Sequence, residues 1–144
     1  MGDFKLSGGC QCGAVRYTIY APANVTEHCH CSICRKCHGA IFVTLSAVPL
    51  DKLTIDQGAD NLATFDSSPK VHRRFCKTCG CHLFEYADDL PDVVFLSTGT
   101  LDGGADPGHP KENEMHIFVG SKVPWYEITD NLPQHEEFSP GAAD

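Results

Sequence analysis

The chain has 144 residues and carries 19 acidic against 11 basic side chains, a formal net charge of −8 with histidine neutral. Its length fits a single domain over residues 1–144, with a frayed tail expected from about residue 136. An acidic surface repels phosphate backbones, so we expect no nucleic-acid partner. The longest apolar run, 40–50, is far too short to cross a bilayer, so no membrane partner is expected either.

Short alternating or β-branched runs dominate the chain and predict strands. The predicted strands are 14–20, 25–30, 41–48, 53–56, 71–75, 83–86, 93–98, 116–119 and 125–128. One short helix is expected at 32–38, with Ser32 as its N-cap, and the Gly- and Pro-rich segment 102–113 predicts a long loop. The residues therefore favour an all-β fold with little helix and with zinc knuckles in its turns.

Nine cysteines fall into three tight clusters, and sulfurs two or three residues apart can converge on one metal ion. The clusters are Cys10 and Cys12; Cys29, Cys31, Cys34 and Cys37; Cys76, Cys79 and Cys81. An odd number leaves one thiol unpaired, and no secretory signal is recognisable near Met1. We therefore expect a cytoplasmic protein with zinc-bound cysteines rather than disulfides.

The first and third clusters predict a closed structural zinc site. In each, the second cysteine of the pair is followed directly by a glycine, and a metal knuckle needs a residue that tolerates positive φ. Two knuckles from distant parts of the chain can close on one ion. The predicted ligands are Cys10, Cys12, Cys76 and Cys79.

The middle cluster leaves more than one arrangement open. Cys29, Cys31 and Cys34 supply three ligands within six residues, as in a catalytic zinc site with one open position. Cys37 stands three residues further on and could close a second structural site, as could a nearby histidine at 28, 30 or 38. An iron–sulfur cluster is disfavoured because the ferredoxin run needs a further cysteine followed by proline.

Four strings in fixed order carry a resemblance that spacing alone does not give. They are Gly9-Cys10-Gln11-Cys12-Gly13 followed by Val15-Arg16-Tyr17, His28-Cys29-His30-Cys31-Ser32-Ile33-Cys34-Arg35, Arg74-Phe75-Cys76-Lys77-Thr78-Cys79-Gly80, and His116 to Trp125. With these strings the chain resembles, over about residues 6–138, the glutathione-dependent formaldehyde-activating enzyme family, which includes centromere protein V.

The resemblance implies several coiled antiparallel β-sheets and two zinc ions per chain. It implies that Cys10, Cys12, Cys76 and Cys79 hold the structural zinc, and that Cys29, Cys31 and Cys34 hold the catalytic one. The implied activity is that of a carbon–sulfur lyase, S-hydroxymethylglutathione synthase, which condenses the glutathione thiol with formaldehyde. Two rival functions are a non-catalytic glutathione carrier and a structural interaction module. The sequence does not predict an oligomeric state.

Glutathione carries two carboxylates, so an acidic protein needs local cations to bind it. Five basic residues are candidates: Arg35, Lys36, Arg73, Arg74 and Lys122. Of these, Arg35, Arg74 and Lys122 are the predicted substrate-binding residues. Cys37 and Cys81 depart from the family pattern, and Cys37 could occupy the open metal position.

The remaining aromatic and histidine residues are expected to be structural. The predicted core aromatics are Phe42, Phe84, Phe95 and Trp125. Strand alternation directs His28 and His30 away from the neighbouring cysteines, and His116 is expected to support the strand in which it lies. Cys81 is expected to pack as a small apolar residue.

Overall fold

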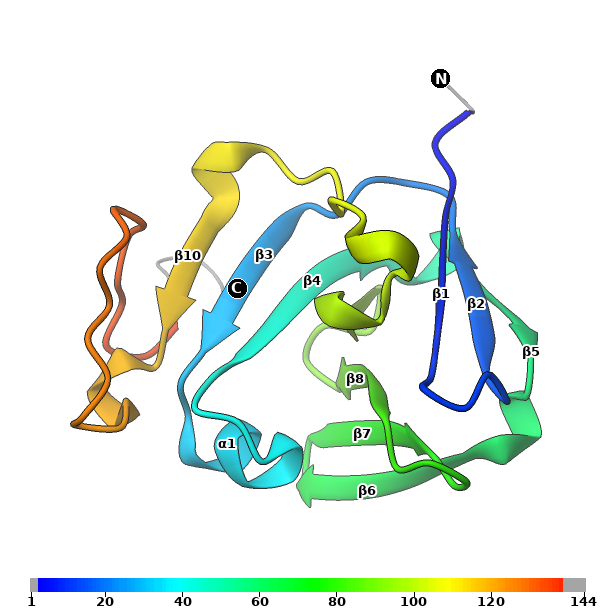
Figure 1. Ribbon diagram of the computed structural model, residues 1–144, viewed down its shortest axis with the longest axis horizontal. Coiled ribbons are helices and arrows are strands. Elements are labelled where there is room, and N and C mark those ends of the chain that lie inside the picture. The colour runs from blue at the N-terminus through cyan, green and yellow to red at the C-terminus, as the bar shows by residue number, and fades with distance from the viewer. Residues whose placement is uncertain (1–2, 139–144) are drawn as a thin grey trace.

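A computed structural model describes residues 3–138, which form two β-sheets (Figure 1). Within these residues the strands are β1 (Leu6–Gly9), β2 (Arg16–Ile19), β3 (Val25–Cys29), β4 (Val43–Pro49), β5 (Leu53–Gln57), β6 (Leu62–Ser68), β7 (Val71–Cys76), β8 (His82–Ala87), β9 (Val93–Ser97) and β10 (Glu114–Ile117). The helices are α1 (Ser32–His38) and the 3₁₀ turns η1 (Leu50–Lys52), η2 (Ala59–Asn61), η3 (Thr98–Thr100), η4 (Asp102–Gly104), η5 (Lys111–Asn113) and η6 (Val119–Ser121). The all-β expectation is confirmed.

The small sheet has the strand order β1-β2-β5, and the large sheet has the order β10-β3-β4-β9-β8-β7-β6. Neighbouring strands are antiparallel throughout, with one exception: β10 pairs with β3 in parallel. The expected antiparallel sheets are therefore present, with one parallel pair at this edge. The long connection after β9 carries the chain across to the far side of β3, so β10 enters the sheet from the same end as β3.

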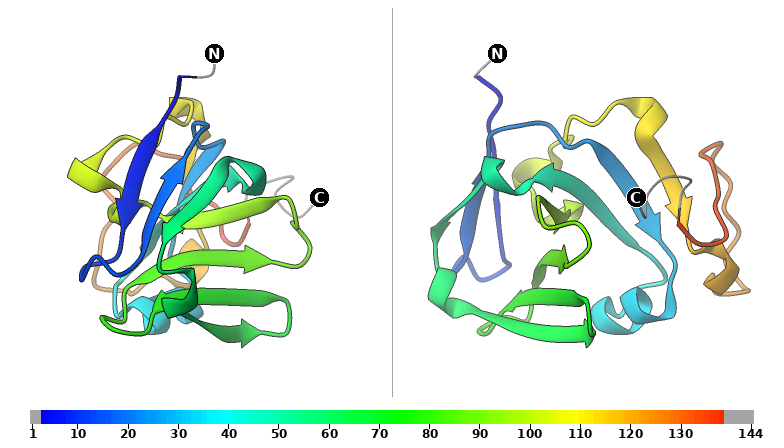
Figure 2. Two further views of the ribbon diagram at one scale, coloured as in Figure 1. Left: turned by 90° about the vertical axis from the view of Figure 1, so that its right-hand side faces the viewer. Right: turned by 180° about the vertical axis from the view of Figure 1, so that it is seen from behind.

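The large sheet coils strongly, so that β6 and β7 run in a very different direction from β3 and β10 (Figures 1 and 2). The small sheet packs against one face of this coil. The main core lies between them, with Tyr17 and Ile19 of β2 against Leu83, Val94 and Leu96 of the large sheet, all five fully buried. Sheets of this kind twist because of the chirality of the backbone, and the coil leaves the other face of the large sheet concave.

Eight of the nine predicted strands are present with ends that differ by a few residues, and the loop at 102–113 holds only two 3₁₀ turns. The predicted strand 125–128 is wrong, because that segment forms no strand. Strands β1 and β6 were not predicted. Residues 139–144 of the predicted frayed tail lie outside the described residues.

The N-cap of helix α1 lies one residue earlier in the chain than expected. The N-cap is Cys31 rather than Ser32, because the Cys31 Sγ accepts a hydrogen bond from the Cys34 backbone N at 3.2 Å. The cap therefore places a sulfur, not a hydroxyl, at the start of the helix. None of the helices within residues 3–138 has the length and apolar character needed to span a bilayer.

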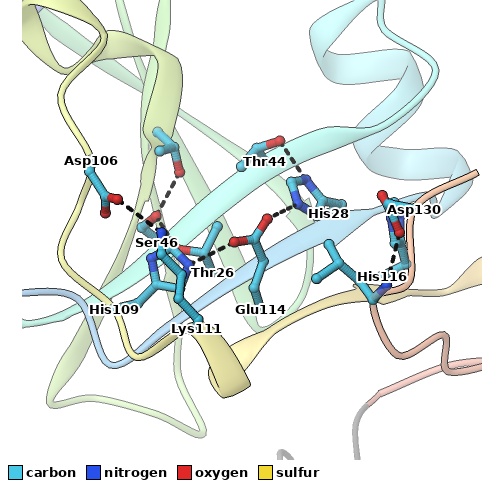
Figure 3. Close-up of polar contacts among 12 residues, drawn as sticks. Thr26, His28, Thr44, Ser46, Asp106, His109, Lys111, Glu114, His116 and Asp130 are labelled. Atoms are coloured by element: carbon cyan, nitrogen blue, oxygen red, sulfur yellow. Dashed lines mark hydrogen bonds and ion pairs between the residues drawn. The ribbon is translucent and has the colours of Figure 1, made fainter.

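A buried polar network joins β3, β4 and β10 on the core face of the large sheet (Figure 3). The Glu114 carboxylate accepts one hydrogen bond from His28 Nε2 and one from His109 Nε2, each at 2.9 Å. His28 Nδ1 pairs with Thr44 Oγ1 at 2.9 Å, and His109 Nδ1 pairs with Thr26 Oγ1 at 3.0 Å. Glu114 therefore ties three strands and the preceding loop together.

His30 and His116 extend this network along the same edge. His30 Nε2 pairs with His116 Nδ1 at 2.9 Å, and His116 Nε2 donates to Asp130 Oδ2 at 3.0 Å. Both histidines are buried. The structural role expected for His116 and the orientation expected for His28 and His30, away from the cysteines, agree with these contacts.

Replacing Glu114 should test how much this network stabilises the fold. Hydrogen bonds from His28 and then from His109 lower the pKa of Glu114. Its stabilisation is therefore present above the unfolded pKa of about 4.3 and is lost as the pH falls through the lower folded pKa. Glu114→Gln should lower the free energy of unfolding at pH 7 by roughly 1–3 kcal/mol.

Urea unfolding of wild type and variant at several pH values measures this difference, which should shrink below about pH 4.3 as the wild-type carboxylate becomes protonated. Glu112→Gln, two residues away on the exposed surface, is the matched control and should change little. Equal losses in both variants would contradict the role given to the network.

Candidate functional site

Four cysteine sulfurs from the two sheets lie within 4.8 Å of one another. Cys10 and Cys12 come from the turn between β1 and β2, Cys76 is the last residue of β7, and Cys79 lies in the turn between β7 and β8. The Cys12 sulfur is 3.6 Å from that of Cys10 and 3.7 Å from that of Cys76. Sulfurs bound to one zinc ion at about 2.3 Å stand roughly 3.8 Å apart in a regular tetrahedron, so the cluster fits this metal.

The backbone around this cluster has the form that a metal knuckle needs. Gly13 and Gly80, each following a pair of cysteines, have φ of +82° and +78°, as expected from the sequence. The backbone N of Val15 donates to the Cys10 sulfur at 3.3 Å, and Asn61 Nδ2 donates to the Cys76 sulfur at 3.3 Å. Donors of this kind stabilise a thiolate and orient it.

The second cluster forms where β3 ends and α1 begins. The sulfurs of Cys29, Cys31 and Cys34 lie within 4.8 Å of one another, and among the described residues no fourth cysteine, histidine or carboxylate joins them. Cys37, although on α1, is outside this group. The cluster therefore offers three soft ligands and leaves one tetrahedral position for water or a substrate.

A cavity of about 310 Å³ opens beside these three cysteines on the concave face of the large sheet. Six apolar side chains in its wall come from five strands and α1, which the coil of the sheet brings around one space: Ile33, Leu45, Val71, Ala87, Phe95 and Ile117. Such a space, mostly apolar with a few polar groups and within the roughly 300–1,000 Å³ range of small-molecule sites, is typical of ligand binding.

The charged groups of the cavity lie close to the sulfurs. Buried Arg73 places Nη2 3.5 Å from the Cys34 sulfur and Nη1 3.1 Å from the Glu85 carboxylate. Burial raises the pKa of Glu85, and Arg73 acts in the opposite direction. Burial, and to a smaller extent Glu85, raise the pKa of Glu27 to about 7. Arg73 thus links the sulfur of Cys34 to the carboxylate of Glu85.

The basic residues predicted to bind substrate lie elsewhere. Arg35, Arg74 and Lys122 do not line the cavity, and the Lys122 Nζ donates to the backbone carbonyls of Val123 and Tyr126. Strand alternation explains the difference on β7, because Arg73 faces the cavity and its neighbour Arg74 faces the other way. The substrate-binding role of the three residues stays a prediction.

The predicted core aromatics divide into three groups. Phe84 is buried at 2%, whereas Phe42 and Phe95 are half-buried and Phe95 lines the cavity. The core position predicted for Trp125 is wrong, because its side chain is 73% exposed. Cys81, half-buried, packs against the main core.

These features define a class: a small β protein with one closed and one open cysteine cluster, the open one facing a cavity. The family model described as "Glutathione-dependent formaldehyde-activating enzyme" matches residues 5–121. The chain belongs to this family, and the resemblance seen in the sequence is confirmed.

Curated relatives support the same assignment. A protein of Phaeosphaeria nodorum named "Putative glutathione-dependent formaldehyde-activating enzyme" is 36% identical over 116 residues, which cover 74% of this chain and 61% of that protein. A protein of Aspergillus flavus with the same name is 36% identical over 88 residues, covering 58% of this chain and 46% of the relative. The matched part thus spans about half of these relatives. Their names support an enzymatic role.

A solved structure shares the fold. The crystal structure of a Rhodobacter sphaeroides protein superposes with a TM-score of 0.56 at 25% sequence identity, covering 68% of this chain and 89% of that one.

Metal analysis of a cysteine variant tests the closed cluster. Cys76→Ala should remove one metal equivalent from the purified protein and lower its melting temperature, because metal binding of this kind contributes several kcal/mol to folding. Elemental analysis and thermal unfolding measure both effects. Cys81→Ala, which changes a neighbouring cysteine outside the group, should keep the wild-type metal content. Unchanged metal content in Cys76→Ala would show that these four cysteines do not form the site.

Proposed function

We propose that the protein is a zinc-dependent carbon–sulfur lyase that joins the thiol of glutathione to formaldehyde, giving S-hydroxymethylglutathione, and also catalyses the reverse reaction. In this proposal both cysteine clusters hold zinc in a reducing, cytoplasmic setting. Cys10, Cys12, Cys76 and Cys79 hold the structural ion. Cys29, Cys31 and Cys34 hold the ion at which the thiol binds.

The observation that carries the proposal is the three-sulfur cluster at the wall of a cavity. The closed cluster has four sulfurs and no position left, whereas the open cluster can accept one more ligand. Zinc bound there would hold a thiol sulfur in its thiolate form near neutral pH. The family to which the chain belongs is named for glutathione and formaldehyde, which makes these the first substrates to test.

The residues around the cluster would prepare it for this role. Cys29 lies at the end of β3, which is paired with a strand on each side, and the Cys31 sulfur accepts a hydrogen bond from the Cys34 backbone N. Arg73, by donating to Cys34, withdraws charge from a site that already has three thiolates. This favours binding of a fourth sulfur, since three thiolates alone repel another anion.

The reaction itself conserves atoms and charge. A bond forms between the thiol sulfur and the carbonyl carbon, the carbon–oxygen π bond breaks, and the proton lost by the thiol ends on the new hydroxyl oxygen. Because glutathione and formaldehyde also combine without a catalyst, a protein that only carried glutathione could imitate activity. Turnover must therefore be measured above that background.

Calorimetric titration of the metal-loaded protein tests the proposal at its first step. Glutathione should bind, and S-methylglutathione, which lacks a free thiol, should bind at least tenfold more weakly. Formation of the adduct should be faster than in buffer alone. Cys31→Ser should abolish both effects while the protein stays folded, because Cys31 is outside the structural cluster.

Cys37→Ser is the matched control, since it removes a thiol on the same helix but outside the group of three sulfurs. It should bind glutathione as the wild type does. Binding of glutathione without any acceleration of the reaction would favour the carrier. If glutathione does not bind at all, or if Cys37→Ser gains affinity because Cys37 had occupied the metal, the open position proposed here does not exist in the wild type.

A further inference from the structure

The cavity beside the three cysteines is much larger than formaldehyde needs. Its volume of about 310 Å³ is several times that of a molecule with two heavy atoms, given that a water molecule takes about 30 Å³ in the liquid. A second hollow shares Glu27, Leu90 and Phe95 with it, so the concave surface continues along β3 and β4. Formaldehyde alone would leave most of this space to water.

The charges of the cavity disfavour the body of glutathione as its occupant. Arg73 is paired with Glu85, and Lys70 at the rim is paired with Asp89 at 3.3 Å. Glu27 has no ion-pair partner among the described residues. Each of the two cations thus already has an acidic partner and Glu27 adds no positive charge, so the described part of the cavity offers no unpaired cation to the two carboxylates of glutathione.

The wall of the cavity far from the sulfurs includes an apolar pair, Val71 and Ala87, at a definite distance from them. Arg73 pairs with Glu85 and Val71 pairs with Ala87 in the register of β7 and β8, so the two pairs form successive rungs on the cavity side. The first rung contacts Cys34. The second lies about 7 Å further along the strands, given two residues at about 3.4 Å each.

From these observations we infer that the cavity binds the apolar tail of an aldehyde larger than formaldehyde, and that the tail extends from the sulfurs past Arg73 to Val71 and Ala87. This inference rests on the proposed function, because it keeps glutathione as the thiol at the open cluster and places its charged body outside the cavity. The product is the hemithioacetal of glutathione with that aldehyde. The sulfur–carbon bond forms, the carbonyl π bond breaks, and the thiol proton ends on the hydroxyl oxygen.

Thioethers of glutathione have no free thiol and cannot add to an aldehyde. They therefore test binding of the tail separately from the reaction. S-hexylglutathione and S-methylglutathione differ only in the length of the alkyl group on sulfur. Calorimetric titration of each into metal-loaded protein should show that the hexyl compound binds at least tenfold tighter, because its tail leaves water for the apolar wall. In turnover assays, hexanal with glutathione should be accelerated over its own uncatalysed rate at least as much as formaldehyde is.

Two variants reduce the space beside the second pair, Val71 and Ala87. Two are used so that the test does not depend on the stability of a single variant. Ala87→Leu and Val71→Phe each fill the space in which the tail ends. Each should reduce the hexyl-over-methyl affinity ratio at least fivefold. Ala40→Leu adds the same side chain at an exposed position that does not line the cavity, and it should keep the ratio of the wild type.

Equal affinity for the hexyl and methyl compounds would overturn the inference, and so would a ratio that both cavity variants leave unchanged. In either case acceleration of the formaldehyde reaction would still support the proposed function. Conversely, absence of glutathione binding and of turnover would remove the proposed function, and this inference with it.

Discussion

Four sulfur atoms from two different sheets meet within 4.8 Å, and this meeting joins the end of strand β7 to the turn between β1 and β2. Cys76 ends β7, and three residues before it Arg73 reaches the sulfur of Cys34 in the other cluster. The closed cluster therefore fixes one wall of the cavity in which the open cluster lies. Since metal binding adds to the folding free energy of so small a protein, loss of the metal proposed for this cluster would disturb the cavity as well as the fold.

Side chains along strand β3 alternate between two faces of the sheet, one with the buried polar network and one with the cavity. Its residues Thr26 and His28 enter the buried network of the core face, whereas Glu27 and Cys29 face the cavity. The network holds β3 against both of its neighbours through side chains as well as through backbone hydrogen bonds. A cysteine at the end of such a strand is held with little freedom, and a rigid ligand set loses less entropy when a metal or substrate binds.

The sequence was sufficient for features that depend on local spacing, and not for those that depend on register. Cysteine spacing predicted the four-sulfur cluster and left open whether Cys37 joins the second one, and local pattern predicted α1. Strand β1 was missed because its two glycines suggested a turn; a side chain at Gly8 would collide with the Tyr17 ring, so glycine is needed there for close packing. The alternating residues at Trp125 suggested a strand although no partner strand lies there. Between Arg73 and Arg74 only the pairing of β7 decides which faces the cavity, and a shift by one residue would exchange them.

In the proposed reaction, the apolar nature of the cavity also bears on which nucleophile reaches the aldehyde. In aqueous solution an aldehyde is surrounded by water, which is itself a nucleophile and is present at a far higher concentration than any thiol. A cavity walled by Leu45, Phe95 and Ile117 holds water poorly, and excluding water favours attack by a sulfur fixed at its edge. The same exclusion strengthens the attraction between Arg73 and the cluster, because charges interact more strongly where the dielectric constant is low. The coil of the large sheet thus provides both the concave shape and the apolar wall that would favour the proposed addition of a thiol to a carbonyl.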